Sequence, residues 1–97
     1  MDGYLERVQL DPVQVAVLRS IAGVQAAEDL PFIASDALVR GLDSPLLREA
    51  AGVAPGDSWE AEAKFRSAAE ELGMATDIDK QVALELLVRH IASSIVT

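Results

Sequence analysis

The sequence predicts an all-α fold, a compact bundle of about five helices with the long C-terminal helix at its centre. Apolar residues make up 51% of the chain but aromatic residues only 4%, which favours closely packed helices over a sheet sandwich. Signals that begin and end helices recur along the chain. The segment 77–97 is apolar on nearly every side as a helix, and such a helix needs cover from several neighbours.

A length of 97 residues suits a single domain, spanning residues 1–97, with a modest core. The first ten residues are ambiguous. Tyr4, Leu5 and Val8 have helical spacing, whereas Gly3 and the short length weaken a helix. A short helix and an N-terminal arm that packs on the body or on a second subunit are both open.

The first clear helix signal opens the segment 12–22. Asp11 followed by Pro12 is an N-cap with proline at the first helical position, where its missing N–H costs nothing. The β-branched residues that follow permit a strand, but the start signal and the length favour a helix. Either Gly23 ends this helix, or the helix continues through residues 25–27.

The second helix is expected over residues 30–40. Asp29-Leu30-Pro31 provides its start, and Gly41 suits the left-handed residue that follows a helix end. The spacing places four residues on its apolar side: Phe32, Ile33, Ala37 and Leu38.

Two further helices precede the last one. Asp43-Ser44-Pro45 begins a two-turn helix over 46–51, which Gly52 closes, and residues 53–56 form a loop. Asp57-Ser58-Trp59-Glu60 is a capping box with Asp in place of Ser or Thr. The helix that it opens ends at Gly73 and directs five residues inward: Ala61, Phe65, Ala68, Ala69 and Leu72. Its solvated face carries two pairs at i,i+4 spacing: Glu60 with Lys64 and Glu62 with Arg66.

The final helix occupies most of the segment 77–97, with Thr76 and either Asp77 or Asp79 as its cap. Its polar residues recur every four positions and therefore lie on one edge: Gln81, Glu85, Arg89 and Ser93. Glu85 and Arg89 have the favourable i,i+4 orientation.

The residue types argue against an enzyme. The chain has no Cys, which excludes disulfides and thiolate metal sites, and His90 is its single histidine. The residues three and four positions from His90 are leucines and serines, so no metal-ligand pattern forms around it. No phosphate-binding glycine loop, dinucleotide motif or nucleophile motif is present. We therefore expect no catalytic residues, no cofactor and no metal.

Charge and hydropathy restrict the partners. Sixteen acidic residues against eight basic ones give a net charge of −8, which argues against nucleic acid as a partner. The final helix is too short for a bilayer and carries Glu85, Arg89 and His90 in its middle, so no membrane is expected. The first residues lack the apolar region of a signal peptide, and a cytoplasmic location is expected.

The stretch Gly41-Leu42-Asp43-Ser44 resembles the start of the motif of acyl carrier proteins, which are small, acidic and helical. That resemblance implies Ser44 as the attachment site of phosphopantetheine. Pro45 replaces the leucine of that motif, and the following helix ends after two turns. An acyl-carrier-like or enzyme accessory domain is therefore the disfavoured alternative.

A second resemblance covers about half of the chain. Residues 37–52 and the later Glu71-Leu72-Gly73 are similar to stretches of short helical actinobacterial proteins of unassigned function. The shared pattern is structural, so it implies a helical fold and no particular activity.

The apolar residues left after the core is built predict an interaction surface. The last turns of the final helix have no later element to shield them, and an exposed apolar patch is typical of an association site. We expect a homodimer or a complex with a protein partner through Leu87, Ile91, Ile95 and Val96, together with Tyr4, Leu5 and Val8. An immunity-like or antitoxin-like protein that masks a basic partner is one subclass. A small-molecule site would instead need a cavity among Leu84, Leu87, Trp59 and Phe65, which more simply fill the core.

Overall fold

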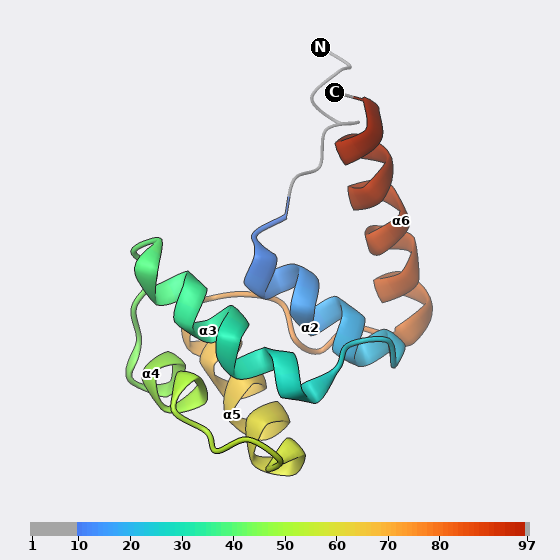
Figure 1. Ribbon diagram of the computed structural model, residues 1–97. Coiled ribbons are helices and arrows are strands. Elements are labelled where there is room, and N and C mark those ends of the chain that lie inside the picture. Colours follow the sequence, from blue (N-terminus) through green and yellow to red (C-terminus); the bar gives the residue numbers. More distant parts are fainter. Residues whose placement is uncertain (1–9, 97) are drawn as a thin grey trace.

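In the part of the chain that the structure describes, five α-helices and one short 3-10 helix form and no β-strand occurs (Figure 1). The computed structural model describes the backbone of residues 10–96 and the side chains of residues 10–93. In chain order the elements are α2 (Pro12–Ala22), η1 (Ala27–Asp29), α3 (Leu30–Val39), α4 (Pro45–Ala51), α5 (Ser58–Glu71) and α6 (Lys80–Val96). The predicted all-α class is confirmed. The segment predicted as a short helix or an arm lies almost entirely outside the described residues.

Most helices begin and end where the sequence places their caps. In α6 the Asp79 carboxylate accepts the Gln81 N–H at 3.0 Å, whereas Thr76, predicted as part of the cap, instead donates its hydroxyl to Glu70. The Asp11 carboxylate accepts a hydrogen bond from the Val13 N–H at 2.8 Å, and the Ser44 hydroxyl accepts one from the Leu47 N–H at 3.0 Å. Gly23 adopts a φ of 81°, in the left-handed region that favours glycine, and α2 ends there. Of the two alternatives for this helix, termination at Gly23 is the one that the structure shows.

The predicted capping box of α5 forms only in part. The Asp57 carboxylate accepts the Glu60 N–H at 3.4 Å, as expected, but the Asp57 N–H donates to the Ala54 carbonyl at 3.2 Å. The Glu60 carboxylate instead pairs with Lys64 at 3.6 Å, and Lys64 also pairs with Glu49 of α4. The Glu60 carboxylate therefore contributes to an ion-pair network between α5 and α4 and does not cap the first turn of α5.

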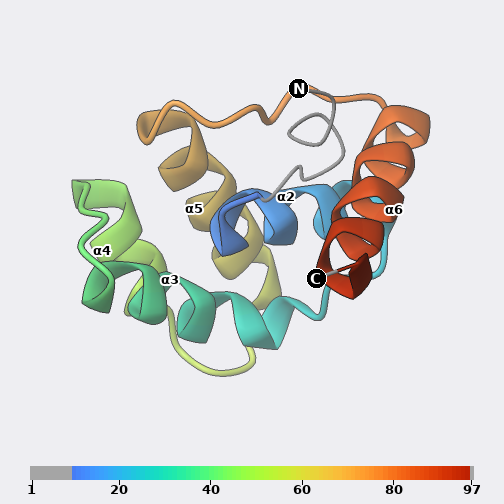
Figure 2. The same cartoon turned by 90° about the horizontal axis from the view of Figure 1, so that it is seen from above.

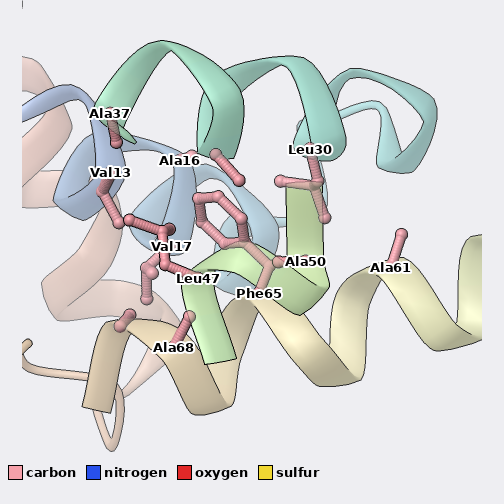
Figure 3. Packing of buried hydrophobic residues seen from close by; sticks show 12 residues of the cluster. Val13, Ala16, Val17, Leu30, Ala37, Leu47, Ala50, Ala61, Phe65 and Ala68 are labelled. Carbon is pink, nitrogen blue, oxygen red and sulfur yellow. The ribbon is translucent and has the colours of Figure 1, made fainter. Parts of the chain in front are cut away.

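The main core lies between α2, α3, α4 and α5 (Figure 3). Phe65 of α5 is 2% exposed and lies at the centre of this core, close to Leu47 and Val17. The remaining buried positions are largely alanines: Ala16, Ala34, Ala37, Ala50, Ala61, Ala68 and Ala69. Small side chains let helices approach closely, so one large ring fills the space that the alanines leave.

The prediction that the C-terminal helix is central is wrong. α6 packs mainly on α2, and it stands on the far side of α2 from α4 and α5 (Figures 1 and 2). Ala83 and Leu87 of α6 form a separate small cluster with Leu18 and Ala22 of α2. Because α2 through α5 complete the main core among themselves, α2 is the central helix and α6 is peripheral.

The predicted apolar side of α3 is also corrected at Phe32, whose side chain is 75% exposed. The inward positions of α3 are Leu30, Ala34 and Ala37, which are spaced four and three residues apart. Phe32 lies two positions from Leu30, a turn of about 200° around the helix axis, and therefore points outward. Among the residues predicted beside it, Ala37 is buried, and Ile33 and Leu38 pack against the core.

An ion pair joins the start of α2 to the end of α3. Arg40 donates to Asp11 at 3.0 Å and to Asp36 at 3.1 Å. Partial burial raises the pKa of Asp11, but hydrogen bonds from the Arg40 guanidinium and the Val13 N–H outweigh that effect and hold it below its ordinary value. Asp11 therefore stabilises the fold through its ionised form. This contribution is complete above the unfolded-state pKa and is lost as the pH falls through the lower folded-state pKa.

Replacing Asp11 with asparagine removes this charge while keeping a good N-cap. We expect a loss of up to about 1 kcal/mol in the free energy of unfolding at neutral pH, as for a surface ion pair. The difference from the wild type should shrink below about pH 5 and vanish in strong acid. Urea unfolding over a pH series measures it, with Glu28→Gln as a control at an exposed carboxylate outside the described ion pairs. A difference that persists unchanged in acid would contradict the assignment.

Candidate interaction surface

Three apolar side chains of α6 form an exposed strip, here named the α6 stripe: Leu84, Val88 and Ile91. Their side chains are 39%, 65% and 55% exposed, respectively. Positions four and three residues apart share one face of a helix. The neighbouring face, with Ala83 and Leu87, packs on α2. The α6 stripe thus borders the packed face and is not covered by the described part of the chain.

Of the two predicted interaction residues whose side chains the structure describes, one is exposed and the other is buried. Ile91 is exposed, whereas Leu87 is only 8% exposed and packs on α2, so Leu87 belongs to the core and not to a free surface. The other predicted members lie outside the described side chains: Tyr4, Leu5, Val8, Ile95 and Val96. Leu84 and Val88 were not among the predicted interaction residues, although their spacing with Ile91 indicates the same helix face.

The polar edge of α6 is less uniform than predicted. Gln81, Glu85 and Arg89 are exposed, but Ser93 is 3% exposed and therefore buried. The ion pairs of the described residues do not include Glu85 with Arg89. Both charged groups remain in solvent beside the α6 stripe.

A groove between α2 and α5, here named the Trp59 groove, is the second surface feature. It encloses about 220 Å³ and is lined by Val17, Ser20, Trp59, Glu62, Ala63, Phe65 and Arg66. Trp59 is 83% exposed, while Phe65 and Val17 are buried beneath the groove. Of the four residues considered for a cavity, Trp59 and Phe65 line this groove together, and Leu84 and Leu87 lie on α6 away from it.

The exposure of Trp59 follows from the pattern of α5. Its buried positions, Ala61, Phe65, Ala68 and Ala69, occupy one face. Trp59 precedes Ala61 by two positions, about 200° around the helix, so it faces away from the core. A tryptophan by residue type favours a core position, whereas the helical register of α5 places Trp59 at the surface.

Two residues considered for chemistry in the sequence, His90 and Ser44, have structural hydrogen bonds. No group of three or more potential metal ligands occurs among residues 10–93. His90 accepts a hydrogen bond from the Leu10 N–H through Nδ1 at 3.4 Å. Ser44 is 8% exposed and its hydroxyl caps α4, a geometry that gives no support to a prosthetic-group attachment site.

Most basic side chains of the main body are already engaged by acids. Arg40 pairs with Asp11 and Asp36, Arg48 pairs with Asp43 at 2.6 Å, and Lys64 pairs with two glutamates. The Arg48 guanidinium holds the pKa of Asp43 below its ordinary value through a hydrogen bond. Arg66 takes part in none of the described ion pairs. Among the described residues, Arg66 therefore presents a guanidinium outside any ion pair beside the exposed Trp59, as Arg19, Lys80 and Arg89 do elsewhere on the surface.

None of the helices in the described range has the length and apolar character needed to cross a membrane. Comparisons with protein-family models, with curated proteins and with solved structures found no match to this chain.

Proposed function

We propose that this protein is a non-catalytic interaction module that forms a homodimer through the α6 stripe. The observation that carries the proposal is the exposure of Leu84, Val88 and Ile91 on a helix that packs mainly on one neighbour. Exposed apolar side chains gathered on one face are a common feature of association sites.

The spacing of the α6 stripe suits a second helix as its partner. Steps of four and three residues match the a and d positions of a heptad, at which two helices interlock their side chains. In the sequence Ile95 continues the pattern by a further four residues. A helix of the same kind is therefore a complementary surface, and most soluble oligomers are symmetric assemblies of identical chains.

Charge restricts how two copies of the chain can meet at this surface. Two copies that each carry a net charge of −8 repel one another, so self-association requires an uncharged contact. The α6 stripe has no charged member, and the two charged residues on its flank, Glu85 and Arg89, have opposite signs. Added salt should therefore tighten the dimer, because it screens the repulsion between the two chains.

The acidity favours a second candidate for such an interaction module, in which the chain masks a basic protein in the manner of an immunity protein or antitoxin. Carboxylates exceed bases by eight over the whole chain. In such a complex, salt would weaken the contact with the basic partner, in contrast to its effect on the homodimer. Size-exclusion chromatography at low and high salt, of the protein alone and co-expressed with a basic partner, distinguishes the homodimer from the masking complex.

Replacing Val88 with glutamate should convert the dimer to a monomer. The variant places two carboxylates against each other in the interface, which costs several kcal/mol and should weaken dimerisation at least about 100-fold. Sedimentation equilibrium at micromolar concentration measures the change, and circular dichroism verifies the helical content.

Val82→Glu is the matched control, since Val82 is 45% exposed on the same helix and lies outside the α6 stripe. That variant should remain a dimer. A wild-type protein that is monomeric at micromolar concentration, or a Val88→Glu variant that dimerises as well as the wild type, would overturn the proposal.

A further inference from the structure

The Trp59 groove combines an apolar wall with a cation that no described acid neutralises. Trp59 and Arg66 are seven residues apart on α5 and therefore share a face, about 10 Å from each other along the helix axis. Ala63 lies between them, and its small side chain leaves the hollow of the groove. Glu62 and Ser20 complete the polar part of its lining.

The polar groups of the groove define which charge it accepts. Arg66 forms no described ion pair, and Glu62, although four residues before it, does not come within pairing distance. A guanidinium offers several N–H donors to a carboxylate. The nearby Glu62 carboxylate repels a second negative charge, so one anionic group is favoured over two.

The space in the groove limits the size of its occupant. About 220 Å³ lies below the range of about 300–1,000 Å³ that is usual for sites of drug-sized ligands. An indole presents a flat apolar surface on which another ring can stack. We propose that the Trp59 groove binds a small planar aromatic carboxylate, with its ring against Trp59 and its carboxylate at Arg66. This site is on α5 and α2 and is independent of the α6 stripe.

The single tryptophan of the chain reports on this site directly. We expect trans-cinnamate to quench or shift the fluorescence of Trp59 in a saturable manner and to displace its indole N–H resonance. The neutral trans-cinnamamide and the dianion of 4-carboxycinnamic acid should each bind more weakly than trans-cinnamate, because the first lacks the charge and the second places a carboxylate near Glu62.

Arg66→Gln should weaken trans-cinnamate binding about tenfold, the loss expected for one charge-assisted contact at a partly exposed site. Arg89→Gln is the matched control: Arg89 is likewise exposed and outside the described ion pairs, but lies on α6, and its loss should leave the affinity unchanged. Glu62→Gln should improve binding of the dianion. Absence of saturable binding, equal binding of cinnamate and cinnamamide, or equal effects of the two arginine variants would overturn the proposal.

Discussion

Phe65→Ala should remove a large share of the stability of the four helices α2 to α5. The ring is 2% exposed and fills the centre of a core that consists otherwise mainly of alanines and a few aliphatic side chains. Removing a buried phenylalanine costs about 3–5 kcal/mol, because the apolar contacts are lost and a cavity remains. A small domain has a free energy of unfolding of about 5–15 kcal/mol, so the expected loss is a large fraction of that free energy.

Urea unfolding followed by circular dichroism measures the effect of this substitution. Trp59→Ala is its matched control, because it removes a larger aromatic ring from the same helix at a position that is 83% exposed. That variant should change the free energy of unfolding by no more than about 0.5 kcal/mol. Similar losses for the two variants would contradict the packing of α5.

Ala83→Asp should release α6 from the body while the other helices stay folded. Ala83 is fully buried against α2, in a cluster with Leu18, Ala22 and Leu87. A carboxylate there would be buried without a partner, which costs several kcal/mol, and detachment of α6 relieves this cost. The main core has no member from α6 and should survive.

Hydrogen exchange measured residue by residue tests this expectation. In the variant, amides of α6 should exchange rapidly, whereas amides of α3, α4 and α5 should keep their protection. Ala92→Asp provides the same change at an exposed position of α6 and should leave all protection intact. Loss of protection throughout the Ala83→Asp variant would show that α6 and the body unfold as one unit.

The starts and ends of the helices could be predicted because local chemistry determines them. Asp11 and Ser44 accept the hydrogen bonds that their positions before a proline indicate, and Gly23 takes the left-handed conformation. Such features depend on a few neighbouring residues. Every α-helix of the described region could therefore be predicted from the sequence.

The relative placement of the helices could not be derived in the same way. The apolar character of α6 suggested a central helix, yet the described structure leaves Leu84, Val88 and Ile91 exposed. An apolar face indicates that a helix needs cover, but it does not specify which chain provides that cover. The exposure of Phe32 and Trp59 could be predicted from the helical register of α3 and α5, because each residue lies about 200° around the helix from a buried position.

The attachment of α6 to α2 also has a consequence for synthesis of the chain. Leu18 and Ala22 belong to an early helix, but the side chains that cover them, Ala83 and Leu87, come more than sixty residues later. During translation the four preceding helices emerge first and can assemble their own core. The outer face of α2 then stays open on the ribosome until α6 arrives, so a nascent chain halted before α6 presents a temporary apolar site to chaperones.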